Sequence, residues 1–187
     1  ADVVHQQAKI GVDIPSDGEQ GKTGFLLYGN QRMSGFEQVI VQPGQSPRAI
    51  RRDQAVFSDF YEDYYKTEGD GGPNWQPVCT SPIAYVGQEI IKSDIDHFKA
   101  ALEKVVVEDA FLPAIAPGTF GRGQNQYYPD EEAFLFAIAD ALKEEYKAII
   151  EAGFVLQIDD PGLPDTWDML NPTPSVAEYQ KYAAVRI

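Results

Sequence analysis

The chain has 187 residues, of which 43% are hydrophobic, and a formal net charge of −14 at pH 7. The length and composition are typical of one globular domain. The negative charge argues against binding to nucleic acid or to anionic membranes, because contacts to phosphates need clustered Lys and Arg side chains. No run of about 18 apolar residues is present, so we expect no transmembrane helix, and we recognise no signal peptide. The single cysteine, Cys79, excludes an internal disulfide and favours a cytoplasmic location.

The first third of the chain predicts few regular elements. Residues 3–10 are expected to form a helix that Gly11 closes. A short strand is predicted over 14–19, and this strand ends in acidic residues. Residues 20–76 then form a long connection, rich in Gly, Pro and aromatic residues, with a short strand expected at 39–41. So long an irregular connection is typical of a functional loop or an excursion from the domain.

Two side-chain clusters mark this connection. Aromatic residues gather over 57–65, where we expect them to pack the excursion, with a surface for stacking a flat heterocycle as the alternative. The basic cluster is Arg48, Arg51 and Arg52, which we interpret as a solvated loop.

From residue 77 onward the pattern becomes regular. A strand is predicted over 77–86, an amphipathic helix over 94–106 and a weaker strand over 110–116. The clearest helix spans 129–152, because Pro129 suits the first helical position and three acidic residues follow it. Its apolar side chains are spaced for one face: Phe134, Ile138, Leu142, Tyr146 and Ile149.

The glycine-rich segment 118–128 invites comparison with phosphate-binding loops. It lacks their Gly-Lys-Ser/Thr ending and does not fit the dinucleotide fingerprint. We therefore expect either a plain polar loop or a mobile lid over a site, with Arg122 available for an anionic group of a ligand.

The last strand of the chain, predicted over 154–159, carries the most informative residues. An apolar run that ends in Asp159, Asp160 and a proline indicates a buried parallel strand with acids at its carboxyl end. In (β/α) barrels that rim is where substrates bind. A capping box from Ser175 to Glu178 then opens a helix that is expected to run to Ile187.

The alternation of strands and helices predicts an α/β fold with a parallel sheet and right-handed crossovers. Three or four such strands make about half of a (β/α)8 TIM barrel, which typically has roughly 250 residues. We therefore predict one domain, residues 1–187, that is part of a TIM barrel, with an irregular excursion over 20–76 and regular β/α units over 77–187. Both chain ends are expected to interrupt helices. A complete, doubly wound α/β domain is the alternative.

Three short motifs occur in order along the chain: residues 16–21 (SDGEQG), 80–83 (TSPI) and 156–161 (LQIDDP). Together they resemble the catalytic barrel of cobalamin-independent methionine synthase and its short single-barrel relatives. That family has Gly-Glu at one strand end, Thr-Gly-Pro at the next and Gln-Ile-Asp-Glu-Pro after a long helix. Ser81 stands where the family usually has Gly, and Asp160 where methionine synthase has Glu. The likeness spans most of residues 8–187.

The resemblance implies a zinc-dependent methyltransferase that moves a methyl group from a folate-like donor to homocysteine or a related thiol. In the family, zinc binds the thiol and lowers its pKa, so that the thiolate attacks the methyl donor. Glu19 and Asp159 match the carboxylates that contact the ammonium group of the amino-acid substrate. Thr80 and Asp160 lie in the same motifs, and the four residues form the expected substrate-binding set.

The family's zinc ligands, which include a His-x-Cys pair on a later strand, have no counterpart in this chain. His5 and His97 lie on predicted helices, and Cys79 lies within a predicted strand as a core thiol. A zinc site of this type needs about three such ligands. We therefore expect no metal-binding or catalytic residue in this chain and no activity from it alone.

Other interpretations remain open from the sequence. The same barrel supports another thiol alkylation or a C–S bond cleavage, or the chain is a non-catalytic subunit that completes a barrel with a partner chain. The acidic residues also have structural explanations: Asp159 and Asp160 suit capping positions beside Pro161, and Glu19 suits a hydrogen bond within its loop.

Overall fold

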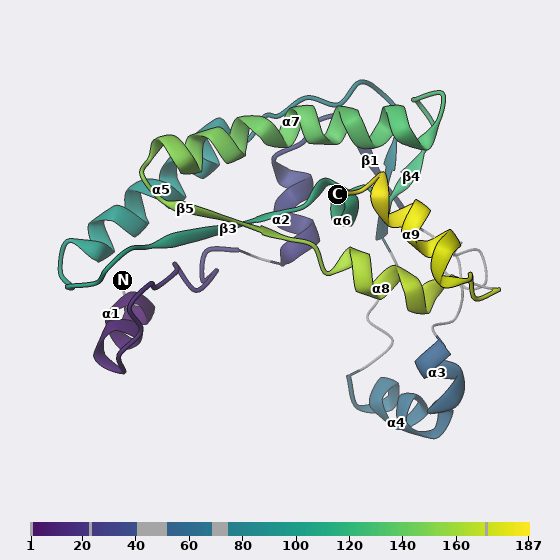
Figure 1. Ribbon diagram of the computed structural model, residues 1–187, viewed down its shortest axis with the longest axis horizontal. Helices are drawn as coiled ribbons and strands as arrows, with labels where there is room; N and C mark the ends of the chain where they lie inside the picture. Colours follow the sequence, from purple (N-terminus) through teal and green to yellow (C-terminus); the bar gives the residue numbers. More distant parts are fainter. Residues whose placement is uncertain (1, 23, 41–51, 69–74, 171) are drawn as a thin grey trace.

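The computed structural model describes residues 2–22, 24–40, 52–68, 75–170 and 172–187. It has a mixed α/β architecture in which long helices lie along one side of a pair of parallel strands (Figure 1). None of the helices in these ranges combines the length and the apolar character that crossing a bilayer requires.

The central unit is a parallel pair formed by β3 (Phe111–Ile115) and β5 (Val155–Asp159). Between them the chain passes through α6 (Pro117–Phe120), β4 (Gln124–Asn125) and the long helix α7 (Glu131–Glu151). Helix α7 runs above the strand pair together with α5 (Gln88–Leu102), as Figure 1 shows. The predicted order of strand, long helix and parallel strand is confirmed.

The core lies between these helices and β3. Helix α7 buries the predicted face, with Tyr146 only partly buried and with its hydroxyl donating to the carbonyl oxygen of Ile115 at 2.6 Å. Aromatic rings close the far end of the core, where the centroids of Phe98 and Phe154 lie 4.8 Å apart. The core side chains of α5 and β3 are Ile91, Ile95, Phe98, Ala101, Leu112, Ala114 and Ile115.

Strand β5 is less buried than the sequence indicates. Val155 and Ile158 are 49% and 51% exposed, so the expectation of a fully buried strand is wrong for the chain as described. The reason is that β3 is the one strand paired with β5 in the described ranges.

A second sheet contains β1 (Phe36–Ile40), β2 (Trp75–Cys79) and β4, in the order β1-β2-β4. Strands β1 and β2 are antiparallel, and β4 is parallel to β2. The strand predicted over 77–86 therefore ends at Cys79, and Tyr85 forms only an isolated bridge with Met33. Neither sheet closes into a barrel within the described ranges.

The predicted strand over 14–19 is instead a turn. Glycine 18 and Glu19 have φ angles of 66° and 54°, in the left-handed region, which an extended strand does not use. Side chains hold this turn, because the Ser16 hydroxyl accepts from the backbone N–H of Gly18 and the Asp17 carboxylate accepts from that of Glu19. Such local bonds compete with strand pairing. The preceding helix, α1 (Asp2–Lys9), is confirmed, with Gly11 at a φ of 90° after it.

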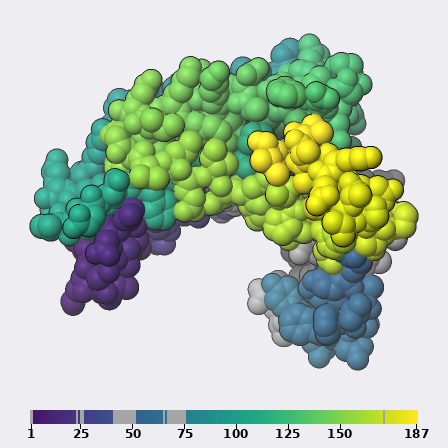
Figure 2. Space-filling view, in the orientation of Figure 1, coloured from purple at the N-terminus to yellow at the C-terminus, as the bar shows by residue number. Residues whose placement is uncertain are grey.

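The connection over 20–76 contains regular elements that the sequence did not predict. They are β1, α2 (Phe25–Gln31), α3 (Arg52–Val56) and α4 (Ser58–Glu68). The strand expected at 39–41 is the end of β1, and residue 41 lies outside the described ranges. Helices α3 and α4 project from the body of the molecule (Figures 1 and 2).

Both side-chain clusters of this connection differ in part from the expectation. The ring of Phe60 packs against those of Tyr61 and Tyr64, with centroids 5.3 and 6.1 Å apart. Phe57, Phe60 and Tyr64 are nevertheless 60%, 62% and 46% exposed, so the aromatic cluster packs on itself and stays largely at the surface. Arg52 begins α3 rather than lying in a loop, and its side chain, although 37% exposed, donates to the carbonyl oxygen of Trp167 at 2.7 Å and thereby links α3 to α8 (Gly162–Met169). Arg48 and Arg51 lie outside the described ranges.

Several helix boundaries also move. Helix α5 begins six residues earlier than predicted, at a glycine without a side-chain cap, and ends before Val106, which is fully exposed. Helix α7 begins after Asp130, whose carboxylate caps Ala133 N at 2.8 Å, so Pro129 precedes the helix. The predicted capping box of α9 (Val176–Ala184) is present, but this helix closes at Ala184 and does not continue to Ile187.

Candidate functional site

The carboxyl end of β5 places Asp159 beside β3. Its carbonyl oxygen accepts from Ala116 N at 2.9 Å, which extends the parallel ladder one step beyond Ile115. Its carboxylate accepts from Gln157 Nε2 at 2.7 Å, as two residues on the same face of one strand can do. Asp159 is half-buried, and the amide of Gln157 fixes one of its oxygens.

The next residue, Asp160, is held by a fully buried threonine of α6. Thr119 Oγ1 donates to Asp160 Oδ1 at 2.5 Å and accepts from Gly162 N at 2.7 Å. This contact needs the glycine, because a Cβ at position 162 would lie 2.5 Å from Thr119 Oγ1. The hydroxyl of Thr119 thus fixes the chain immediately after β5 and the start of α8.

Glu19 lies in the turn that replaces the predicted strand. Its Oε1 accepts from Lys22 Nζ at 2.8 Å, and the same ammonium donates to the carbonyl oxygen of Pro113 in β3 at 3.0 Å. The turn is anchored to α1, because the amide of Gln7 donates to the carbonyl of Ser16 at 2.9 Å and accepts from its N–H at 3.1 Å.

These bonds place the Glu19 turn at one edge of β3 and β5 at the other. Ala110 O and Ala116 N bond to β5, whereas Phe111 N bonds to Pro15 O and Pro113 O bonds to Lys22. Alternate residues of a strand direct their backbone groups to opposite edges. Glu19 and Asp159 are therefore both tied to β3, from its two sides.

Thr80 is placed elsewhere. It follows β2 in the second sheet, and its hydroxyl donates to Glu37 Oε1 at 3.0 Å on the exposed side of β1. In the described part of the chain, the bonds of Thr80 are to β1 and to Gly35 and do not reach Asp159 or Asp160.

A buried ion pair that the sequence analysis missed lies behind the Glu19 turn. Arg32, which follows α2, pairs with Glu145 of α7, and their side chains are 3% and 1% exposed. The guanidinium also lies 3.7 Å from the ring centroid of Tyr28 and donates to its carbonyl oxygen at 3.1 Å. Burial raises the pKa of the nearby Tyr85 hydroxyl, and the charge of Glu145 raises it further. The sequence contained a signal for this pair, since Glu145 falls on the apolar face of α7.

Tyr28 connects the ion pair to the turn. Its hydroxyl donates to Asp94 of α5, and the ammonium of Lys22 lies 5.3 Å from its ring centroid. Burial, and next the charge of Asp17, raise the pKa of the Asp94 carboxyl. These polar groups surround a cavity of about 10 Å³, close to the minimum volume for one water molecule.

The residues considered for metal binding do not come together. The described ranges contain no group of three or more His, Cys, Asp or Glu side chains with a geometry that could hold a metal ion. Cys79 is buried, as predicted, and burial raises the pKa of its thiol, which donates to Ser81 O at 3.5 Å. His97 is exposed on α5.

The segment 118–128 is neither a plain loop nor an open lid with a free arginine. Its residues contribute to α6 and β4. Arg122 donates to Asp165 of α8 at 3.2 Å and to Thr119 O at 3.4 Å, so its guanidinium is already engaged within the chain.

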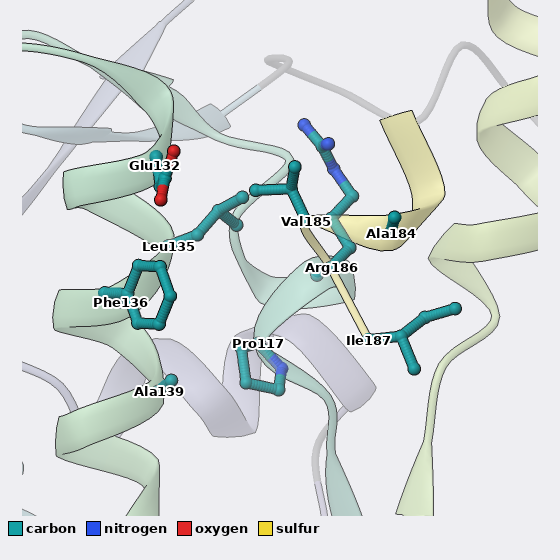
Figure 3. A pocket seen from close by; sticks show the side chains of 10 residues that line it. Pro117, Glu132, Leu135, Phe136, Ala139, Ala184, Val185, Arg186 and Ile187 are labelled. Carbon is teal, nitrogen blue, oxygen red and sulfur yellow. The ribbon is translucent and has the colours of Figure 1, made fainter. Parts of the chain in front are cut away.

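Larger hollows also border these elements in the described part of the chain. The one nearest the Glu19 turn has a volume of about 290 Å³ and is lined by Asp17, Gln20, Asp94 and His97, among others. A shallow groove of about 600 Å³ lies between α5 and α7. The third, of about 350 Å³, has Leu135 and Phe136 of α7 on one side and Val185 and Ile187 on the other (Figure 3). None of the predicted site residues lines the third hollow.

Comparison with known proteins supports the resemblance carried by the motifs. No family model matches the chain. The methionine synthase of Sulfurisphaera tokodaii is 22% identical over 165 residues, that of Pyrococcus furiosus 23% over 163 and that of Pyrococcus abyssi 25% over 167; each alignment covers 86% of this chain. The chain spans about 40% of the length of these relatives.

A solved structure shows a similar fold. The B12-independent methionine synthase from Shewanella sp. W3-18-1, in complex with selenomethionine, aligns with a TM-score of 0.58 and 20% identity. The alignment covers 90% of this chain and 42% of that one. With the sequence matches, the chain is therefore a distant relative of the cobalamin-independent methionine synthases, as its three motifs indicate.

Proposed function

We propose that this chain forms the amino-acid-binding part of a methionine-synthase-type methyltransferase, in which Glu19 and Asp159 bind the ammonium group of homocysteine or a related thiol. The observation that carries the proposal is the position of both acids relative to β3. Glu19 reaches the strand at Pro113 through Lys22, and Asp159 pairs with Ile115 across the ladder. Two carboxylates tied to one strand can hold a cation by charge-assisted hydrogen bonds.

The relatives support methyl transfer as the reaction. Those described above share the name methionine synthase, which favours methyl transfer over the C–S cleavage that the motifs alone leave open. The Shewanella enzyme was solved with selenomethionine, an amino acid that carries an ammonium group. A folate-like compound as the methyl donor and homocysteine as the acceptor are part of the proposal.

The protein's own groups would orient the substrate. Gln157 fixes one oxygen of Asp159, and Thr119 fixes Asp160 and the peptide N–H of Gly162. The acidic groups at the end of β5 are thus held in place before a ligand arrives. Such preorganisation reduces the entropy lost when the substrate is positioned for reaction. We assign Asp160 to the support of this strand end. Thr80, whose hydroxyl bonds to Glu37 in the second sheet, stays in the proposed substrate-binding set but away from these acids.

Zinc is implied by the family and would supply the activation of the thiol. The donor set described here does not fit it. The thiol of Cys79 is buried, its raised pKa disfavours the thiolate that zinc requires, and His97 lies on the surface of α5. We therefore place the zinc ligands outside these residues and assign no step of the reaction to zinc bound by them.

The architecture supports part of a TIM barrel as the setting of this site. We propose that residues 1–187 form one domain, and that further strands continue the sheet beyond β5. Two of its apolar side chains, Val155 and Ile158, are about half exposed. A strand that continues the sheet beside β5, from more of the same polypeptide or from a second subunit, would cover them.

The test is the affinity for homocysteine of the complete enzyme and its variant Asp159→Asn. A hydrogen bond to a charged group contributes about 1.5–3 kcal/mol, so we expect the Kd to rise by roughly 10- to 100-fold. The Kd for 4-mercaptobutanoate, which lacks the amino group, should stay unchanged. Asp140→Asn, at an exposed position of α7, is the matched control. Equal affinities of the wild-type and Asp159→Asn proteins for homocysteine would exclude the assignment.

A further inference from the structure

We propose that the Glu19 carboxylate and the Pro113 carbonyl oxygen form a preformed subsite for a primary ammonium group, which the side chain of Lys22 occupies until a ligand displaces it. The inference rests on the proposed function, because it specifies how the amino group of the substrate would be bound. It adds the backbone of β3 as a ligand and makes Lys22 an internal competitor of the substrate.

The surroundings of Lys22 Nζ match the needs of an ammonium group. An ammonium group has three N–H donors. Lys22 Nζ lies 2.8 Å from Glu19 Oε1, 3.0 Å from Pro113 O and 5.3 Å from the ring centroid of Tyr28. A carboxylate, a carbonyl oxygen and an aromatic face therefore surround one cation. The Lys22 side chain is only 11% exposed.

Other lysines of the chain form ion pairs of a different kind. Lys92 lies 2.7 Å from Asp96, one turn away on α5, but its side chain is 68% exposed. Lys66 and Lys147 also pair with acids one turn away and are 69% and 54% exposed. Burial against a strand carbonyl distinguishes Lys22 from them, so an ordinary surface pair does not account for its position.

The turn keeps its shape without the Lys22 side chain. Lys22 N donates to Glu19 O at 3.0 Å through the backbone, and the caps from Ser16 and Asp17 fix Gly18 and Glu19. Removing the ammonium would leave the Glu19 carboxylate, whose side chain is 40% exposed, and Pro113 O in place, where both can accept hydrogen bonds from another ammonium group.

A second acidic surface lies close enough to accept the Lys22 ammonium after its displacement. The hollow of about 290 Å³ beside the turn is lined by Asp17 and Asp94, and the electrostatic influence of Lys22 already reaches Asp94. The ammonium of Lys22 can therefore exchange one acidic environment for another when a ligand ammonium takes its position.

The experiment uses Lys22→Ala, which removes the atoms from Cγ to Nζ, and propylammonium chloride, which replaces them. We expect propylammonium to raise the thermal unfolding midpoint of Lys22→Ala by several degrees, since a ligand that binds only the folded state stabilises it. It should leave the wild-type protein and the control Lys92→Ala unchanged. The neutral analogue 1-propanol should have no effect on any of them, and Glu19→Gln combined with Lys22→Ala should abolish the response.

Binding of homocysteine to the complete enzyme and its Lys22→Ala variant separates this inference from the proposed function. If Lys22 competes with the substrate, Lys22→Ala should bind homocysteine roughly tenfold more tightly than wild type, which corresponds to about 1.4 kcal/mol. If propylammonium stabilises Lys22→Ala and homocysteine binds neither protein, the subsite stands and the proposed substrate is wrong. If propylammonium has no effect on Lys22→Ala, the subsite is refuted, whatever homocysteine does.

Should Lys22→Ala fail to fold, the proposal is tested on the wild-type protein by measuring the acetylation rate of each lysine with mass spectrometry. A lysine held in the subsite reacts much more slowly than Lys92, and Glu19→Gln should accelerate its reaction. Equal rates for Lys22 and Lys92 in the wild-type protein would overturn the proposal.

Discussion

The buried pair of Arg32 and Glu145 should be the most sensitive point of the fold. We consider Arg32→Met, which keeps a long side chain but removes the charge, and the double variant in which Glu145→Met is added. In the single variant the Glu145 carboxylate, 1% exposed, loses its cation. The ring of Tyr28 also loses the guanidinium that lies 3.7 Å from its centroid.

The expected cost follows from the burial of both side chains. Removing one partner of a buried ion pair destabilises a protein by about 3–5 kcal/mol, because it leaves an uncompensated charge. With a urea m-value of about 2 kcal/mol per molar, the unfolding midpoint should fall by roughly 2 M. Replacing both partners with apolar side chains is often nearly neutral. The double variant should therefore regain most of the stability that Arg32→Met loses.

Urea unfolding of the four proteins of this cycle, followed by circular dichroism, measures the coupling. If Arg32→Met and the double variant lose equal stability, the pair does not hold the end of α2 to α7.

Two further predictions concern other buried polar groups. Burial and the charge of Asp17 raise the pKa of Asp94, so stability from its protonated form is present below its unfolded pKa of about 3.9 and lost as the pH rises through the folded value. Asp94→Asn should be more stable than wild type at pH 7, and this advantage should vanish near pH 4 in thermal unfolding; a constant difference would contradict the reasoning. Thr119→Val removes the hydroxyl between Asp160 and Gly162 and should cost about 3 kcal/mol in urea unfolding, whereas Thr119→Ser should cost about 1 kcal/mol or less. Similar losses in both would mean that packing, rather than the hydroxyl, matters at Thr119.

Elements that depend on local periodicity were predictable from the sequence. Helix α7 and its apolar face, the parallel pair β3 and β5 and the capping box of α9 follow from spacing and capping chemistry, and the structure confirms them. The strand predicted over 14–19 is a turn in the structure. The side chains of Ser16 and Asp17 bond to the backbone there and compete with strand pairing, which the hydrophobic pattern alone does not reveal.

Some residues of the candidate site were predictable from the sequence, and others were not. The sequence motifs identified Glu19 and Asp159, and the structure ties both to β3. Lys22 and Pro113 could not be found by pattern, since their contact joins residues 91 positions apart. Glu145 was accessible to sequence reasoning, because a charged residue at a core position of an amphipathic helix indicates a buried partner.

The proline in the middle of β3 gives this strand edge two separate uses. Phe111 donates its N–H to Pro15 O on the edge that faces away from β5, but Pro113, next on that edge, has no N–H to donate. A neighbouring strand would lose one ladder hydrogen bond at this point, and a second chain would find the edge a poorer template for aggregation. The neighbouring segment turns away here, and the Pro113 carbonyl accepts from a cation instead. The same missing hydrogen thus weakens backbone pairing and leaves an oxygen for an amine.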